Sequence, residues 1–219
     1  ATYMGSGPVL TLLSNRRQDF DSAKYSLVQH FPDLLQADPR GALSILTRLS
    51  TIGRPQPVQH QVVWGGHAAA ITEDGSHLTD VGTSYTEHDL AALLSSFQAY
   101  VTNATVVQTR DLADALTAAP QAAVVWRRVL LAAPRNPVLA DIFFSDPAAI
   151  VTKHLAPELA GPASTMAGAL HPTLETVAAV KLEAAVLALK PLDADDGSQD
   201  WARKNRRYQM FLNALSAEH

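Results

Sequence analysis

Apolar residues recur at helical spacing over the first fifty residues and predict two amphipathic helices. The stripe of the first helix consists of Phe20, Ala23, Leu27 and Phe31. Asp21 or Ser22 can cap the start of this helix, because a short polar side chain accepts a hydrogen bond from an unpaired N–H of the first turn. Asp38-Pro39 opens the second helix and Gly53 closes it. The stripe of the second helix consists of Ala42, Ile45, Leu46 and Leu49.

The helical period breaks at residues 58–72, VQHQVVWGGHAAAIT, where two short runs flank Gly65-Gly66. Two such runs separated by a pair of glycines predict a β-hairpin. Four apolar positions should anchor this hairpin on the helices, namely Val58, Val62, Trp64 and Ile71. A second turn is predicted at residues 73–76.

Thr86 can cap a strong helix whose stripe is Leu90, Leu93, Leu94, Phe97 and Val101. The rest, up to residue 190, is helical too, in short elements that open on proline. These prolines are Pro120, Pro134, Pro137, Pro147, Pro157 and Pro172. Proline in the first helical turn costs no hydrogen bond, so it marks helix starts. Helices of roughly 8–18 residues are typical of the helical pairs in an α-solenoid.

We therefore predict a mostly α fold, with a degenerate helical-repeat (α-solenoid-like) body and one small inserted β-hairpin. The chain is expected to form a single helical domain over residues 1–219. Its parts are the N-terminal helices at 1–55, the hairpin insert at 56–85, the helical body at 86–190, an acidic linker at 191–200 and a C-terminal helix at 201–219.

The composition narrows the class of protein. Of 219 residues 47% are hydrophobic but only 6% aromatic, so small aliphatic side chains should fill the core. The formal charge of −4 argues against a broadly cationic nucleic-acid binder. The chain has no cysteine, which excludes disulfides and thiolate metal sites.

Its apolar runs are too short to span a bilayer and its start lacks a basic signal-peptide region, so we expect a soluble cytoplasmic protein. Ala1 in place of methionine suggests a fragment or a processed product.

Histidines gather around the predicted hairpin. They are His60, His67, His77 and His88, with Asp74, Asp80 and Asp89 nearby. Three histidines and a carboxylate could bind zinc, but alternation along strands sends neighbouring side chains to opposite faces. Neither a phosphate-binding glycine loop nor a nucleophile elbow is present in the sequence. We therefore predict a protein that is not an enzyme and holds no cofactor or metal.

Two groups of arginines are candidate contact residues. Arg16 and Arg17 precede the first predicted helix, whose start Asp19 and Asp21 complement electrostatically. In the C-terminal helix, WARKNRRYQMFLNAL, three arginines lie opposite an apolar stripe. The stripe is Trp201, Tyr208, Phe211, Leu212 and Leu215, and the arginines are Arg203, Arg206 and Arg207. Either the stripe packs on the body with the arginines outward, or the helix detaches and docks on an acidic partner.

Lys181 interrupts a predicted apolar face in HPTLETVAAVKLEAAVLAL. That face comprises positions 174, 177, 178, 182, 185 and 189, while Glu175 and Glu183 lie on the polar side. The lysine either snorkels to water along a groove or pairs with a carboxylate from another helix or another chain.

The segment GPVLTLLSNRRQDFDSAKYSLVQHFPDLLQADPRGAL resembles one found in large bacterial NTPases of the STAND class, beyond their ATPase core. AAITEDGSHLTD, VWRRVLLAAP and KLEAAVLAL resemble the hairpin and helices that follow it. Those proteins are nucleotide-dependent sensors, many of them in antiphage and conflict systems. The resemblance implies a regulatory piece of such a protein, in which Arg16 and Arg17 would face the neighbouring ATPase module.

Three functions follow as hypotheses. The first is a non-catalytic sensor or regulatory module of a STAND-type NTPase that acts by protein–protein contact in antiviral defence. Its partner would be another protein or the neighbouring ATPase module, with homo-oligomerisation left open and no membrane contact. The second is a winged-helix-like nucleic-acid-binding module, disfavoured because its second helix offers only Arg40 and Arg48 for contacts. The third is a metal-dependent hydrolase that uses His60, His67 and His77.

Overall fold

The computed structural model describes residues 7–52, 58–75, 85–152, 155–192 and 197–216. Within these ranges the chain forms nine α-helices around one small sheet, which confirms a mostly α fold with an inserted β element. The helices are α1 (Gly7–Ala37), α2 (Pro39–Thr51), α3 (Tyr85–Asn103), α4 (Val106–Ala118), α5 (Ala123–Ala132), α6 (Pro137–Phe144), α7 (Ala160–Leu170), α8 (Thr176–Leu187) and α9 (Gln199–Ser216). The strands are β1 (Gln59–Trp64), β2 (His67–Thr72) and β3 (Gln121–Ala122). The solenoid-like arrangement remains a prediction.

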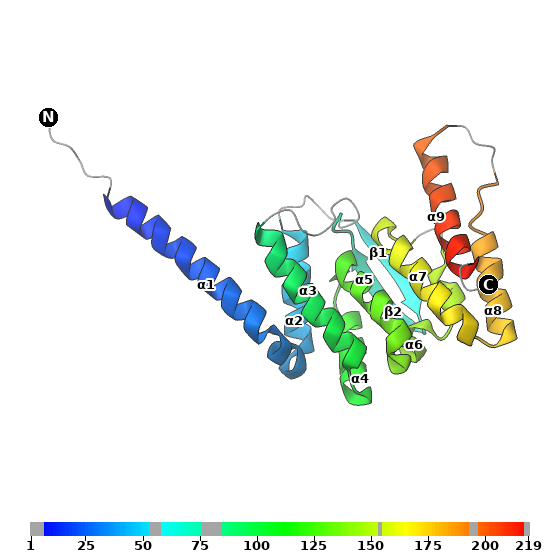
Figure 1. Ribbon diagram of the computed structural model, residues 1–219, viewed down its shortest axis with the longest axis horizontal. Helices are drawn as coiled ribbons and strands as arrows, with labels where there is room; N and C mark the ends of the chain where they lie inside the picture. Colours follow the sequence, from blue (N-terminus) through cyan, green and yellow to red (C-terminus); the bar gives the residue numbers. More distant parts are fainter. Residues whose placement is uncertain (1–6, 53–57, 76–84, 153–154, 193–196, 217–219) are drawn as a thin grey trace.

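Helix α1 is far longer than the sequence pattern predicts. It begins at Gly7, runs through Asp21 and Ser22, and passes Pro32 before it ends at Ala37. The predicted start at Asp21 or Ser22 is therefore wrong, because a cap residue contributes only about 1 kcal/mol and does not prevent a helix from continuing through it. Only the C-terminal part of α1 packs against α2 and α3, where Phe31 and Leu35 are fully buried. The rest extends away from the body (Figure 1).

Helix α2 starts as the sequence predicts. The Asp38 side chain accepts a hydrogen bond from the Gly41 N–H at 3.0 Å, and Pro39 occupies the first helical position. The buried side chains are those of Ala42, Leu43 and Leu46. Leu49, expected in the stripe, is 37% exposed, because the buried face is turned toward Leu43.

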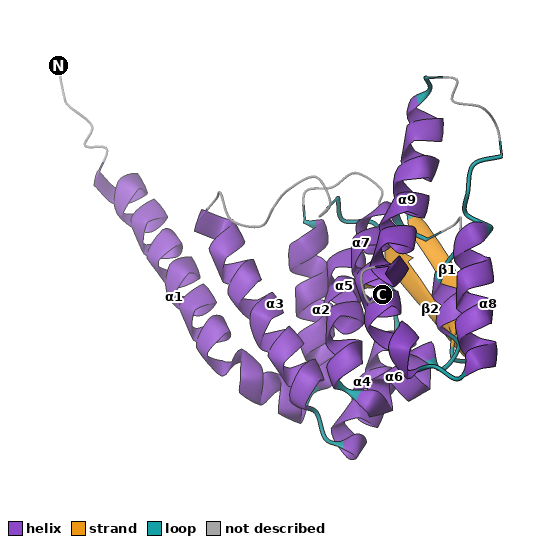
Figure 2. Cartoon of the chain, turned by 45° about the vertical axis from the view of Figure 1, so that its right-hand side comes forward, coloured by secondary structure: helices purple, strands orange, loops and turns teal. Residues whose placement is uncertain are grey.

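The predicted hairpin is confirmed, with Gly65 and Gly66 at its turn. Both glycines have positive φ (55° and 81°), a backbone conformation that residues with a Cβ seldom adopt. The sequence pattern did not predict β3, which pairs in parallel with the end of β2 through Ile71 and Thr72. Its anchor comes from α2, where the Thr47 hydroxyl accepts from the Ala122 N–H at 3.1 Å. The hairpin runs along the side of the helical body (Figure 2).

Prolines open several of the short elements between α5 and α8, as predicted. Pro137 is the first residue of α6, and Pro147 and Pro157 begin the 3₁₀ turns η2 (Pro147–Ile150) and η3 (Pro157–Leu159). Two further 3₁₀ turns are η1 (Ala133–Arg135) and η4 (His171–Thr173). Among the helices of the described ranges, none combines the length and the apolar character needed to cross a bilayer.

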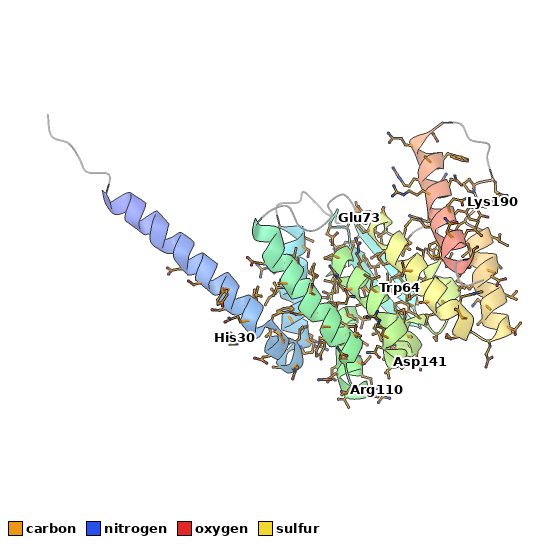
Figure 3. All side chains as sticks on the ribbon, viewed as in Figure 1. His30, Trp64, Glu73, Arg110, Asp141 and Lys190 are labelled. Atoms are coloured by element: carbon orange, nitrogen blue, oxygen red, sulfur yellow. The ribbon has the colours of Figure 1, made fainter. Side chains whose placement is uncertain are left out.

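The hairpin is fastened to the helices by a cluster of aromatic rings. Trp64 at the end of β1 is 1% exposed, and its ring lies 5.2 Å from that of Trp126 in an edge-on arrangement and 5.5 Å from that of Phe144. Figure 3 shows Trp64 inside the body, among side chains from several helices. Ile71 is also fully buried, whereas Val58, predicted to anchor the hairpin, is 56% exposed because it lies before the first paired residue of β1.

Replacing Trp64 by alanine should lower the free energy of unfolding by about 3–5 kcal/mol, the range for large buried aromatic side chains. Urea unfolding followed by circular dichroism measures this loss. The adjacent Val63→Ala is the matched control, since Val63 is 64% exposed and its truncation should cost less than about 0.5 kcal/mol. Equal effects of the two substitutions would contradict the packing of the hairpin described above.

Candidate functional site

Helix α9 brings three arginines to one face at the end of the molecule remote from α1 (Figure 1). Arg203, Arg206 and Arg207 are spaced by three and four residues, so they share a side of the helix with Met210. On the other side Tyr208, Phe211 and Leu215 are buried against the body, as the sequence predicts. The helix is therefore an integral part of the fold, and the stripe holds it there.

The position of α9 is fixed by glycine-mediated contact with α7. A Cβ atom added at Gly168 would lie 2.7 Å from the carbonyl oxygen of Ala214, so the two backbones approach more closely there than any other residue allows. Nearer the start of both helices the contact is looser, since a Cβ at Gly161 would meet only the end of the Met210 side chain at 3.2 Å. This wider separation leaves space between α9 and the body.

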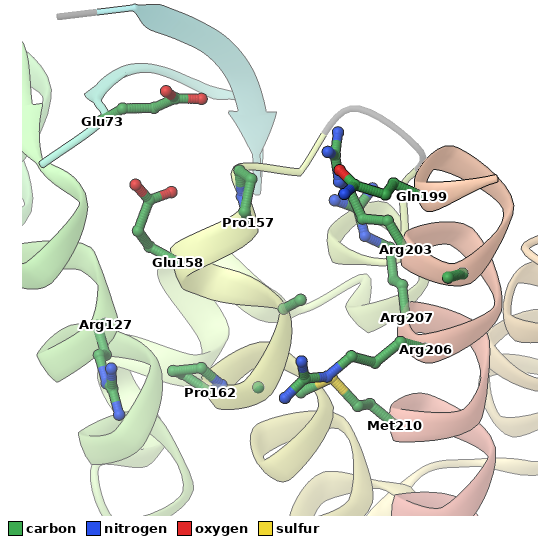
Figure 4. Close-up of a pocket in the computed structure, with 13 residues that line it drawn as sticks. Glu73, Arg127, Pro157, Glu158, Pro162, Gln199, Arg203, Arg206, Arg207 and Met210 are labelled. Atoms are coloured by element: carbon green, nitrogen blue, oxygen red, sulfur yellow. The ribbon is translucent and has the colours of Figure 1, made fainter. Parts of the chain in front are cut away.

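That space holds two adjacent pockets that share lining residues; we call them together the α9 groove, and each pocket a lobe of it. The Arg206 lobe has a volume of about 810 Å³ and lies between α9, η3, the start of α7 and Arg127 of α5 (Figure 4). The Trp201 lobe, of about 660 Å³, lies on the other side of α9, next to His60 and Lys190. Four residues line both lobes, namely Glu73, Pro157, Arg203 and Arg207. Volumes of this size are typical of ligand-binding sites.

Positive charge predominates in the α9 groove. Its basic side chains are those of Arg127, Lys190, Arg203, Lys204, Arg206 and Arg207, against the carboxylates of Glu73, Glu158 and Asp200. Each carboxylate already has a partner. Glu73 pairs with His60 at 2.7 Å and Asp200 with Lys204 at 2.6 Å. Glu158 accepts a hydrogen bond from the Gly75 N–H at 3.1 Å. The chain as a whole carries −4, so the groove has the opposite sign to the molecule.

The arginines of the groove differ in their roles. Arg207 is partly buried and donates hydrogen bonds to the backbone carbonyl oxygens of Leu155 at 2.8 Å and Thr152 at 3.4 Å. Burial lowers the pKa of Arg207, and the neighbouring Arg203 lowers it further. Within the described part of the chain, no ion pair or side-chain hydrogen bond joins Arg127, Arg203 or Arg206 to another residue. These three guanidinium groups therefore retain their donors for a ligand.

One wall of the groove is held in place by residues 73–75 after β2, of which Glu73 lines the groove. Glu73 pairs with His60 of β1, and the Gly75 N–H donates to the Glu158 carboxylate. Between them, Asp74 is 2% exposed and accepts from the Val124 N–H at 2.6 Å, at the start of α5. A carboxylate at a helix N-terminus satisfies an unpaired N–H and complements the helix dipole. The segment thus joins the hairpin, α5 and η3 and fixes the side of the groove that faces α9.

The structure does not bring the other predicted contact residues to this site. Arg16 and Arg17 lie inside α1, so the prediction that they precede a helix start is wrong. Lys181 of α8 forms an ion pair with Asp146, which confirms a partner from another element, but its side chain is 61% exposed and the pair is not buried. Most of the apolar face predicted around Lys181 is found, since Leu182 and Leu189 are buried and Leu174 and Ala185 pack against the core. Val177, predicted in that face, is instead 82% exposed, and Val186 is buried in addition.

Of the histidines considered as possible metal ligands, His60 and His67 do not converge. In the hairpin register His60 lies opposite Ile71 and His67 lies opposite Trp64. These two residue pairs are four positions apart, which is roughly 13 Å along the strands. The His67 ring lies 5.4 Å from that of Phe143. His77 and Asp80 fall outside the described residues, and among those that are described no group of three potential ligands occurs.

Sequence reasoning did not single out Arg127, Glu73 or Glu158 as site residues. Arg127 stands with Arg128 in the otherwise apolar α5, and this was the available signal. Glu158 is 3% exposed, although it lies in a short segment that reads as a surface turn.

Comparison with known proteins leaves the site to be interpreted from its own chemistry. The chain matches no protein-family model, and neither the curated proteins nor the solved structures contain a significant match.

Gly168→Ala should destabilise the protein by about 1–3 kcal/mol, because the added methyl group meets backbone rather than a movable side chain. Gly161→Ala is the matched control on the same helix. There the new methyl group meets only the flexible end of Met210, and the better helix propensity of alanine should leave stability equal or slightly higher. Thermal unfolding of both variants measures the difference, and a tolerated Gly168→Ala would refute the tight α7–α9 contact.

Lys181→Met should change the free energy of unfolding by less than about 1 kcal/mol, since exposed ion pairs contribute little. Denaturant unfolding at low and moderate salt tests this, and Asp146→Asn should behave alike. A loss of several kcal/mol would mean that the pair is desolvated in solution.

Proposed function

We propose that this chain is a non-catalytic interaction module whose α9 groove binds an acidic segment of a partner protein. The observation that carries the proposal is the excess of basic side chains in the groove of an otherwise acidic chain. Arginine binds carboxylates through two parallel N–H donors, so unpaired guanidinium groups around a cavity favour an anionic ligand.

The shape of the groove favours an extended ligand over a compact one. The two lobes meet at Arg203 and Arg207 and lie on either side of the first turns of α9, so a peptide could follow the groove around the helix. The Arg206 lobe also has apolar lining from Pro157, Pro162 and Met210 (Figure 4). Apolar contacts beside charged anchors are typical of protein–protein interfaces.

The resemblance to the region beyond the ATPase core of STAND-class NTPases gives this binding a proposed setting. In that setting the module would be a cytoplasmic regulatory unit in bacterial antiviral defence. An acidic surface of the neighbouring ATPase module, or of another protein, would occupy the groove. A P-loop ATPase encoded in the same reading frame, or directly beside it, would support this setting.

A hexa-aspartate peptide with blocked ends is a direct probe of the groove. Isothermal titration calorimetry should detect binding that weakens as salt is added, because the contacts are between charges. The double variant Arg203→Glu/Arg206→Glu should bind at least about tenfold more weakly, since each charged hydrogen bond contributes about 1.5–3 kcal/mol.

The matched control reverses two exposed arginines of α2, as Arg40→Glu/Arg48→Glu, and should bind the peptide like the wild type. The same control separates the proposal from nucleic-acid binding. Duplex DNA that binds more tightly than the peptide, and loses its affinity in the α2 double variant, would overturn the proposal in favour of a winged-helix-like module.

A further inference from the structure

Glu73 is placed where it affects any anion that enters the α9 groove. Its carboxylate lines both lobes and stands on the wall opposite the arginines of α9 (Figure 4). The same carboxylate forms a pair of 2.7 Å with Nε2 of His60, whose side chain is 24% exposed. Glu73 therefore faces the ligand space on one side and a titratable imidazole on the other.

We propose that Glu73 is a specificity-determining residue of the groove and that His60 sets its effective charge, so that an acidic ligand binds together with a proton. This inference rests on the proposed function of the groove and adds the condition under which the groove accepts its ligand.

The sign of the effect follows from the charges. With neutral His60, the Glu73 carboxylate keeps its full negative charge and repels the carboxylates of a ligand, which lowers affinity. When His60 is protonated, the pair is neutral overall and the arginines act on the ligand without this opposition. Because the ligand prefers the protonated form, linkage requires that ligand binding takes up a proton. Affinity for an acidic peptide should therefore rise as the pH falls.

Other charged side chains also surround His60. Those that line the same lobe are Glu73, Lys190, Asp200, Arg203, Lys204 and Arg207. Imidazole is the side chain that ordinarily changes charge between about pH 5 and 8. Of the described residues that line the groove, His60 is the one histidine, so a pH effect on binding in that range is assigned to it.

The chain supplies a matched control pair outside the groove. His171 and Glu183 also form a histidine–carboxylate pair, with 2.9 Å between Nε2 and Oε1, but they join η4 to α8 and line neither lobe. Substitution of His171 removes one histidine–carboxylate pair of the same kind and leaves the groove lining unchanged.

The experiment is calorimetric titration of the whole chain with the blocked hexa-aspartate peptide at about pH 8 and about pH 6, where aspartate stays ionised. We expect binding to be at least about fivefold tighter at the lower pH, the smaller end of typical coupling between sites. Repeating the lower-pH titration in two buffers with different heats of ionisation should show net uptake of protons on binding.

Variants assign the effect to the pair. At pH 6, His60→Gln should bind the peptide as weakly as the wild type does at pH 8. Glu73→Gln should bind tightly already at pH 8, because the fixed repulsion is gone. His171→Gln should retain the wild-type pH dependence. Circular dichroism of each variant confirms that it is folded.

The outcomes separate this inference from the proposed function. If the wild type binds the peptide equally at both pH values, or if His60→Gln keeps the full pH dependence, the inference is wrong and the groove remains an acidic-peptide site. Glu73→Gln that fails to bind more tightly at pH 8 also overturns it. If no binding is detected at either pH, the proposed function and the inference both fail.

Discussion

The bond between the Asp74 carboxylate and the Val124 N–H is the contact on which the arrangement of this protein depends. A charge that is almost fully buried must be compensated, and here the N-terminus of α5 compensates it. Because Asp74 lies two residues after β2 and α5 directly follows β3, this bond supports the register of the short parallel strand pair. It also fixes the flanking residues, so Glu73 and Gly75 stand where His60 and Glu158 meet them.

The α9 groove follows from two opposing requirements on one helix. The apolar side of α9 and the tight crossing at Gly168 draw its C-terminal half onto α7. Arg203 lies one turn from both Arg206 and Arg207, and these three like charges repel one another instead of packing together. Among these three arginines, and within the described residues, Arg207 alone donates to backbone carbonyl oxygens of the body, those of Thr152 and Leu155. The result is a helix that is held at one end and lined by a charged cavity at the other.

Local patterns predicted the elements whose signals are short in range. The Gly65-Gly66 turn, the Asp38 cap and the buried stripe of α9 depend on residues within a few positions, and each is found as predicted. The two-residue strand β3 has no such local signal. It is stabilised by hydrogen bonding to Thr47 and by pairing with β2, both more than 45 residues away along the chain. The groove combines residues of α5, η3 and α9 for the same reason. The sequence alone indicated the arginines of α9 as site residues. Arg127 and Glu158 could be assigned to the site only once the fold showed that they line the same groove.

The length of α1 has a mechanical consequence. The helix is anchored near Phe31 and Leu35, and its first residue lies 24 positions before Phe31, roughly 36 Å along the axis. If the helix tilts as a rigid rod about a point beside Pro32, a small rotation there becomes a large displacement at its first residue. A tilt of about 10° at the anchor displaces the far end by about 6 Å, a little more than one helical turn. A small repacking of Phe31 and Leu35 would therefore move the start of α1 by several ångströms.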